Sequence, residues 1–300
     1  MVDITYHPRG APPDARFAIV IPTWNNLPYL KLCLESLRKH SHFRHQVILH
    51  INEGTDGTLA WAREQELSFT HSPSNVGICY GMNAAASLAR APALAYFNDD
   101  MYVCPDWDRA LVEDIEQQDT PLWFVSSTLI EPSGTGNPCV IHADFGQTVE
   151  SFRESELLAR FSHLPKEDQQ NPGGAANVVP LSLWRQVGGY SIEFSPGWNS
   201  DPDFAMKLWH AGVRYFKTVS DSRVYHFHNK TGRRVGPRDQ GRRLFAAKWG
   251  LTSAKFMKHY LHHGEPFEGR LTDPAPHWEL LFARLRGRFA GLFRPPPAFK

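Results

Sequence analysis

The sequence has no long apolar run and no apolar leader. No stretch of the 300 residues approaches the roughly 18 uncharged apolar residues that a membrane span requires. Residues 1–15, which we interpret as an N-terminal tail, lack the apolar core of a signal peptide. We therefore expect a chain that neither spans a bilayer nor is secreted by that route.

The sequence also lacks an excess of charge and a disulfide framework. Its 32 Lys and Arg against 31 Asp and Glu give a formal net charge of +1, so no global field predicts a nucleic-acid partner. The 4 cysteines are widely spaced without a Cys-x-x-Cys pair, which favours reduced thiols in the cytoplasm. With 42% hydrophobic residues, the composition is that of an ordinary enzyme acting on a small ligand.

Strand-like and helix-like patterns alternate over the first 130 residues. Short runs rich in β-branched and aromatic residues predict strands at residues 16–23, 45–52, 67–73, 93–99 and 121–130. A helical pattern follows Asn26, which we expect to be its cap, with apolar side chains on one face at Leu27, Leu30, Leu34 and Leu37. The alternation predicts an α/β fold with a mostly parallel sheet, covered by helices, that binds ligands at the carboxyl ends of its strands.

Three polar residues, Asn98, Asp99 and Asp100, end the strand predicted at 93–99. Burying two carboxylates without a cation costs several kcal/mol, so a divalent metal with a phosphate is one explanation. A solvated turn is the other, because Asn and Asp are common in turns. Three more strand ends carry polar and glycine residues, in "PTWNN", "INEGTDGT" and "SPSNVGICYGMN". Four such ends in succession favour a nucleotide pocket.

The order "IPTWNN", "NEGTDGT", "NVGICYGMN", "FNDDM" resembles the GT-A glycosyltransferases of family 2, over roughly residues 16–235. The resemblance implies a GT-A catalytic domain at 16–235, with a donor half at 16–130 and an acceptor half at 131–235. A helical extension, 236–300, would follow. It also implies a nucleotide-diphosphate-sugar donor, Mn²⁺ or Mg²⁺ on the diphosphate, and single displacement with inversion. The acceptor would be a glycan, lipid-linked or other hydroxyl, as in polysaccharide biosynthesis.

The resemblance also assigns residues to the donor site. It implies donor-binding roles for Pro22, Thr23, Asn25, Asn52, Asn75, Gly77, Asn83, Asn98 and Asp99, and a metal-binding role for Asp100. Two departures matter, because an ungapped match puts Ile51 where an acid often reads the base, and Asn98 replaces the first Asp of the metal motif. Asn75 and Asn83 have a second interpretation, in which they only cap and pin the helix that they begin.

A second carboxylate pair, Asp201 and Asp203, precedes an amphipathic helical pattern. Ser200 followed three residues later by Asp203 predicts a capping box, so Asp203 is as well explained by helix capping as by chemistry. An acid at a helix N-terminus stays ionised, and an inverting transfer needs a base for the acceptor hydroxyl. The resemblance makes Asp201 that base.

In "RVYHFHNKTGRR", His226 and His228 alternate, so in an extended segment they point the same way. Either could be a metal ligand or an ordinary polar residue on a strand. The resemblance favours His226, with His228 as the alternative. Lys230, Arg233 and Arg234 would form a basic strip that neutralises the leaving diphosphate.

Residues 277–294 form a basic amphipathic pattern, which indicates either a peripheral contact with the inner face of the membrane or packing on the chain's own domain. The sequence does not determine the oligomeric state, and a homo-oligomer is one of the alternatives. Two functions compete: an inverting sugar transferase, and a catalytically silent protein that binds nucleotide sugars or glycans on the same fold. Asp100, Asp201 and His226 together favour the enzyme.

Overall fold

The computed structural model describes residues 2–134, 136–171, 174, 176–228, 238–275 and 278. The first half contains β1 (Thr5–His7), β2 (Phe17–Trp24), α1 (Leu27–His40), β3 (Gln46–Asn52), α2 (Thr58–Glu64), β4 (Ser68–Ser72), α3 (Gly77–Ala86), β5 (Ala93–Tyr96), β6 (Met101–Val103), α4 (Trp107–Glu116) and β7 (Trp123–Glu131). The second half contains β8 (Val140–His142), α5 (Glu154–Arg160), β9 (Gln169–Gln170), β10 (Asn177–Pro180), α6 (Leu181–Val187), α7 (Ser200–His210), β11 (Tyr215–His226), α8 (Arg238–Trp249) and α9 (Ser253–His259). Short 3₁₀ helices lie at Phe161–His163 and Ile192–Phe194.

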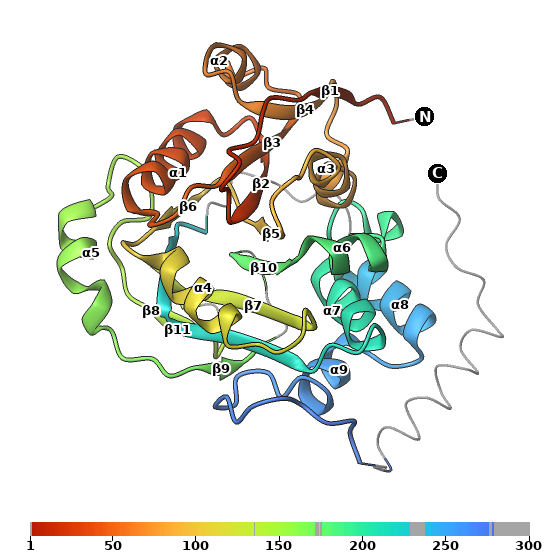
Figure 1. Cartoon of the computed structure of the whole chain (residues 1–300). Coiled ribbons are helices and arrows are strands. Elements are labelled where there is room, and N and C mark those ends of the chain that lie inside the picture. The colour runs from red at the N-terminus through yellow and green to blue at the C-terminus, as the bar shows by residue number, and fades with distance from the viewer. Residues whose placement is uncertain are drawn as a thin grey trace.

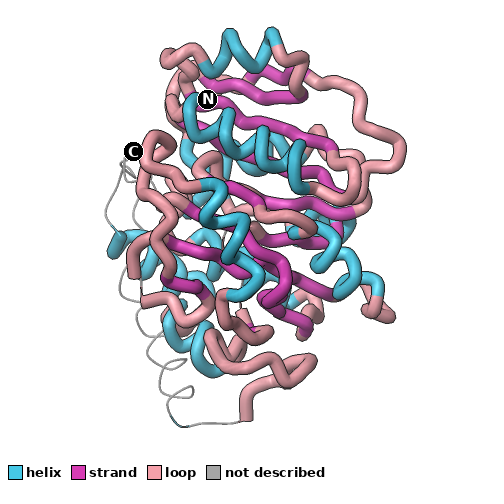
Figure 2. The backbone as a smooth tube through the Cα atoms, turned by 90° about the vertical axis from the view of Figure 1, so that its left-hand side faces the viewer, coloured by secondary structure: helices cyan, strands magenta, loops and turns pink. Residues whose placement is uncertain are grey.

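The described strands form one sheet in the order β1-β4-β3-β2-β5-β10-β7-β11-β6, with β8 beside β7 and β9 beside β11. In the donor half, β4, β3, β2 and β5 run parallel to one another, whereas β1 is antiparallel to β4. In the other half, β10 is antiparallel to β5 and β7, whereas β11 is parallel to β7. The α/β class with a mostly parallel sheet is therefore confirmed, and Figure 2 shows this sheet running the length of the molecule with helices against it.

Alternate residues of β2 face opposite sides of the sheet, as the two-residue repeat of a strand requires. Ile19 and Ile21 pack with Leu30 of α1 in one buried cluster. Val20 packs with Met82 of α3 in the other. Figure 1 accordingly places α1 and α4 on one side of the sheet and α3, α6 and α7 on the other. Because helices cover both faces, a ligand can reach the sheet only at the ends of its strands. In α/β sheets the carboxyl ends are where ligands bind.

The helices beyond residue 235 join this core. Phe245 of α8 and Phe256 of α9 are fully buried in the cluster that contains α3 and α7. Among the described helices, none is long and apolar enough to cross a bilayer. The amphipathic pattern expected at 277–294 lies, apart from the exposed Trp278, outside the described residues.

Candidate functional site

Asp99 joins the carboxyl ends of two neighbouring parallel strands, β2 and β5. The hydroxyl of Thr23 donates to its Oδ2 (2.6 Å), and the amide of Asn26 donates to its Oδ1 (3.0 Å). Burial, and then the nearby Asp100, raise the pKa of Asp99 to about 7. Asn26 occupies the N-cap position of α1, as expected, but its side chain makes no capping hydrogen bond. Its amide donates to Asp99, and the backbone N–H of Leu27 at the start of α1 donates to the carboxylate of Asp56 (2.8 Å).

Asn52 lies buried at the end of β3 and connects three other segments. Its Oδ1 accepts from the backbone N–H of Val76 (2.9 Å) and from the hydroxyl of Ser72 (3.2 Å). Its Nδ2 donates to the carbonyl of Thr23 (3.5 Å). Asn52 therefore fixes the ends of β2, β3 and β4 and the start of α3 relative to one another. Its contact with a nucleobase stays a prediction.

The acid at the end of β3 is Glu53, which the ungapped sequence match overlooked. Ile51, the residue in that matched position, is fully buried among apolar side chains. Oε2 of Glu53 accepts from Nδ2 of Asn25 (3.0 Å), whose own Oδ1 accepts from the backbone N–H of Thr55 (2.9 Å). Both Asn25 and Glu53 have a positive φ, at 47° and 59°. Glu53 lies two residues beyond Ile51, so a match without gaps could not bring it to the acidic position.

Three residues predicted to shape the donor pocket lie on or beside α3, and two of them, Gly77 and Asn83, contact the segment at 190–196. Oδ1 of Asn75 accepts from the backbone N–H of Gly77 (2.9 Å). Gly77 has a φ of 77°, and a Cβ there would lie 2.6 Å from Pro196, so no other residue fits. The amide of Asn83 bonds the backbone of Tyr190 in both directions, at 2.7 and 2.9 Å. These contacts agree with the interpretation in which Asn75 and Asn83 fix the position of the helix. Their role in donor binding stays a prediction.

His226 faces the strand end that carries Asp100. The backbone pairs His226 with Met101 across β11 and β6, and this register brings Nε2 of His226 to 3.3 Å from Oδ1 of Asp100. Nδ2 of Asn98 lies 3.4 Å from the same nitrogen. Asp100 and His226 are 6% and 8% exposed. Of the two candidate histidines, His226 is therefore the one that meets the predicted metal motif.

The other candidates in this segment are either exposed or outside the described residues. His228 is exposed, and its ring centre is 5.3 Å from that of His226. The predicted basic strip, Lys230, Arg233 and Arg234, lies outside the described residues.

The second ring nitrogen of His226 determines which form of the ring can meet a metal. Nδ1 lies 2.9 Å from Oε1 of Glu131, a carboxylate that can only accept, so Nδ1 carries a hydrogen. In the neutral ring, Nε2 then presents a lone pair to the carboxylate of Asp100. Two electron-pair donors at this distance need a positive charge between them, which either a proton on Nε2 or a bound metal ion supplies. Burial alone would lower the pKa of His226, but Asp100 and Glu131 outweigh it and raise that pKa to about 10.

Asp100 and His226 fit a divalent cation. Two ligands at right angles, each about 2.1 Å from an octahedral cation, are about 3 Å apart, which is close to the 3.3 Å between Oδ1 and Nε2. A carboxylate oxygen and an imidazole nitrogen are both ordinary ligands for Mn²⁺. Among the described residues, no group of three or more His, Cys, Asp or Glu side chains is placed to hold a metal. The protein would therefore provide two ligands and leave the remaining positions to phosphate oxygens and water.

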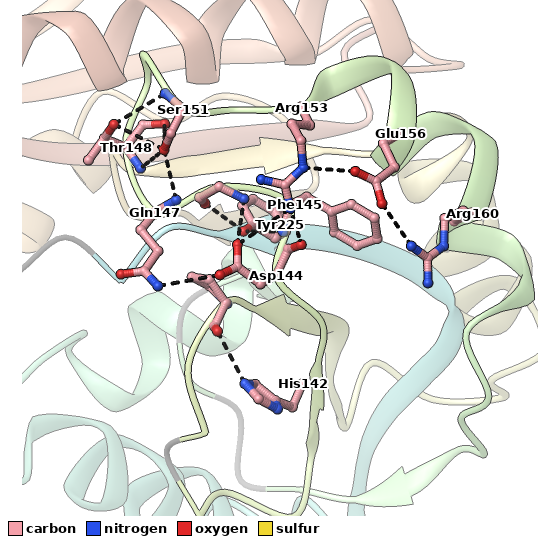
Figure 3. A network of polar contacts seen from close by, with 12 residues as sticks. His142, Asp144, Phe145, Gln147, Thr148, Ser151, Arg153, Glu156, Arg160 and Tyr225 are labelled. Carbon is pink, nitrogen blue, oxygen red and sulfur yellow. Dashed lines mark hydrogen bonds and ion pairs between the residues drawn. The ribbon is translucent and has the colours of Figure 1, made fainter.

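A loop packed against β11 keeps His226 in place. The phenol of Tyr225 accepts from the backbone N–H of Phe145 (3.1 Å) and donates to the carbonyl of Gly146 (2.6 Å). Figure 3 shows these contacts within a wider polar network that runs from His142 to Arg160. The ring of Phe152 contacts those of Tyr225 and Phe227, on either side of His226 in the chain.

Asp201 and Asp203 have different surroundings, although they share the first turn of α7. The phenol of the buried Tyr190 donates to Oδ1 of Asp201 (2.8 Å). Asp203 is fully buried and binds three donors from other elements: Ser191 (2.5 Å), Trp249 (2.8 Å) and Lys248 (2.9 Å). Asp203 thus ties α8 to α7, whereas Asp201 is the partly exposed acid of the pair.

The predicted capping box is wrong. α7 begins at Ser200, so the cap position belongs to Asn199, which makes no side-chain cap hydrogen bond. The hydroxyl of Ser200 donates to the carbonyl of Gly197 (2.9 Å), and the backbone N–H of Asp203 donates to the carbonyl of Asn199 (3.1 Å). The donors from α8 give Asp203 stronger partners than a backbone amide would, because one of them is a charged lysine.

Comparison with known proteins identifies the fold and the enzyme class. Residues 18–157 match the family described as glycosyl transferase family 2. S. aureus TarS 1-349 in complex with UDP-GlcNAc has a TM-score of 0.56 at 16% identity, over 78% of this chain and 66% of that chain. GalNAc-T7 with UDP, GalNAc and Mn²⁺ has 0.56 at 12% identity, over 82% and 53%. Mannosyltransferase PcManGT from Pyrobaculum calidifontis, in complex with GDP-Man and Mn²⁺, has 0.53 at 17% identity, over 98% and 74%. No curated protein sequence matches the chain.

Proposed function

Because the chain is a glycosyltransferase with a family 2 domain at residues 18–157 and a GT-A fold, we propose that it is a metal-dependent, inverting sugar transferase. The donor is a nucleotide-diphosphate sugar, and the acceptor is a hydroxyl of a glycan or of a lipid-linked molecule. The observation that carries the proposal is the pair formed by Asp100 and His226, whose donor atoms are 3.3 Å apart at the carboxyl edge of the sheet. In an α/β sheet this edge is where ligands bind.

Asp100 and His226 would hold Mn²⁺ or Mg²⁺. When bound, the cation neutralises charge on the diphosphate as it leaves. The donor lies along the ends of β2 to β5, where Pro22, Thr23, Asn25, Asn52 and Asp99 line the base and ribose, and Asn75, Gly77 and Asn83 shape the pocket. Glu53 adds a carboxylate that accepts N–H groups of a base. Such groups occur on both uracil and guanine, so UDP and GDP are the first nucleotides to test.

Asp201 is the general base. Its carboxylate takes the proton of the acceptor hydroxyl while the hydroxyl oxygen forms a bond to the anomeric carbon. The bond from that carbon to the diphosphate oxygen breaks on the opposite face, and the electron pair leaves with the nucleoside diphosphate. This single displacement inverts the anomeric centre. Tyr190 holds one oxygen of Asp201, so the direction of the carboxylate is set before the acceptor binds.

An acceptor carried by lipid places the enzyme at a membrane. We propose that the chain acts in the cytoplasm in polysaccharide assembly, with residues 277–294 as a peripheral contact at the inner face of the membrane. The four cysteines are buried and free, as reduced thiols would be.

A thermal-shift screen of nucleotide sugars with and without Mn²⁺ tests the proposal. One donor should raise the melting temperature in the presence of Mn²⁺ and less in its absence, because a ligand that binds only the folded state stabilises it. NMR analysis of the product made with that donor should show that the transferred sugar has the anomeric configuration opposite to that of the sugar in the donor. Stabilisation that is equal without metal would refute the metal role, and retained configuration would refute the single displacement.

A further inference from the structure

Glu131, which ends β7, is a buried carboxylate whose side chain has one polar partner within the part of the chain that the structure describes. It is 4% exposed, and its Oε1 lies 2.9 Å from Nδ1 of His226. Its Oε2 is buried and has no hydrogen-bond partner among the described residues. Burying a carboxylate costs several kcal/mol unless it is paired. Among the described residues, the contact with the ring of His226 is what offsets this cost.

We propose that Glu131 is a positioning residue for the metal ligand His226. By accepting from Nδ1, it keeps the hydrogen on that nitrogen and directs the lone pair of Nε2 towards Asp100. A histidine that binds a metal commonly donates its other N–H to a carboxylate in this way. The inference rests on the metal site in the proposed function and adds to it the residue that selects the ring's tautomer and orientation.

The sheet register provides the geometry. β7 and β11 run parallel, and Ile130 pairs with Tyr225, so the next residues along, Glu131 and His226, come together at the same strand edge. The backbone of Glu131 is held from the other side by β8, where it pairs with His142. Neither side chain therefore needs a flexible loop to reach the other.

A second buried histidine and carboxylate in this chain shows what a purely structural pair looks like. Nε2 of His45 lies 2.9 Å from Asp108, and its Nδ1 accepts from the backbone N–H of Phe17 (3.3 Å). Both oxygens of Asp108 accept hydrogen bonds, including those from the backbone of His42 and Phe43. In that pair every ring nitrogen and carboxylate oxygen is satisfied by the protein. At His226 the second nitrogen instead faces a second carboxylate, Oδ1 of Asp100 at 3.3 Å, where a cation could lie between them.

Mn²⁺ binding to purified variants tests the inference. Free Mn²⁺ is measured by EPR in titrations of the full-length protein with MnCl₂ alone, with UDP and with GDP. Glu131→Gln should weaken Mn²⁺ binding by about 10- to 100-fold, the range seen when such a partner is lost. Glu154→Gln is the matched control, because Glu154 also accepts a hydrogen bond, from Tyr102 (2.5 Å), but does not contact His226. Its Mn²⁺ affinity should equal that of the wild type.

Asp100→Ala separates a failure of this inference from a failure of the metal site. If Asp100→Ala weakens Mn²⁺ binding and Glu131→Gln does not, Glu131 has no positioning role and the metal site stands. If Asp100→Ala leaves Mn²⁺ binding unchanged, the metal site itself is wrong, and the role of Glu131 falls with it.

If the Glu131→Gln variant does not fold, the tautomer of His226 in the wild-type protein tests the inference instead. Long-range ¹H–¹⁵N spectra of the Mg²⁺-loaded protein, assigned with His226→Gln, should show a hydrogen on Nδ1 of His226 and none on Nε2. The reverse tautomer would overturn the inference.

Discussion

The phenol of Tyr190 donates a 2.8 Å hydrogen bond to Oδ1 of Asp201, at the start of the helix that carries both acids of the second carboxylate pair. Asn83 of α3 holds the backbone of Tyr190 by two hydrogen bonds, so this helix helps to place the proposed base. The two halves of the molecule are thus joined through the residue that orients Asp201.

Tyr190→Phe should lower kcat by about tenfold or more, since a hydrogen bond to a charged group contributes about 1.5–3 kcal/mol. Donor affinity should stay near that of the wild type, because the phenol contacts Asp201 and not the proposed metal ligands. Steady-state kinetics and donor titration measure the two effects. Tyr215→Phe is the matched control: its phenol donates to the remote carboxylate of Asp114, so it should lose stability and keep kcat. Equal losses of kcat in both variants would contradict a specific role for Tyr190.

Asp201→Asn should cut turnover by about 10² to 10⁴, the usual cost of losing a general base, while donor binding persists. Asp203→Asn should instead destabilise the fold by about 2–3 kcal/mol, because it removes the charge that holds Ser191, Trp249 and Lys248. Urea unfolding and single-turnover kinetics distinguish the two. If the phenotypes are exchanged, Asp203 and not Asp201 is the base.

Asp100→Ala should remove the effect of Mn²⁺ on donor binding and leave the fold intact. The residue lies at a strand end beside His226, and its side chain is not part of an apolar cluster. Donor titrations at rising Mn²⁺ concentration provide the measurement, with circular dichroism as the control for folding. Unchanged Mn²⁺ dependence in a folded variant would refute the role of Asp100.

The pH dependence of stability should contain a contribution from Asp108. Burial alone would raise the pKa of Asp108, but the hydrogen bonds from His45, His42 and Phe43 outweigh it and lower that pKa. The folded state therefore binds the proton less readily than the unfolded state, whose Asp pKa is about 3.9. The contribution is present above that pH and is lost as pH falls through the lower, folded value. Asp108→Asn should be less stable at pH 7 and lose less stability from pH 5 to 2, as urea unfolding would show. A parallel curve would contradict this account.

Removing residues 276–300 should leave a folded protein that binds donor. The cut must come after Asp273, because the backbone of Leu271 donates to the carbonyl of Arg214 (2.8 Å) and Asp273 pairs with the Arg214 side chain (2.8 Å). The intact chain should co-sediment with anionic liposomes at low salt and dissociate as salt rises, since screening weakens attraction to the headgroups. An intact chain that ignores liposomes, with an insoluble truncation, would place the tail in the core.

The sequence was sufficient for the α/β class, the order of the donor motifs and their position at one sheet edge. β2, β3, β4 and β5 follow from local patterns, and parallel strands bring their carboxyl ends together whatever the details of packing. It could not show how individual polar side chains are used. Asn26 and Ser200 fit the local rules for helix capping, yet a carboxylate and a loop carbonyl brought near by the fold take their hydrogen bonds instead.

Only the tertiary structure showed His226 beside Asp100, gave Asp203 its partners on α8 and brought Glu131 to His226. Local pattern treats two alternating histidines alike, because both point to the same side of an extended segment. The register of β11 against β6 and β7 distinguishes them, by placing His226 beside Asp100 and beside Glu131, which is 95 residues away in the chain. Strand pairing at that separation depends on how the whole sheet assembles, and no short window of sequence carries it.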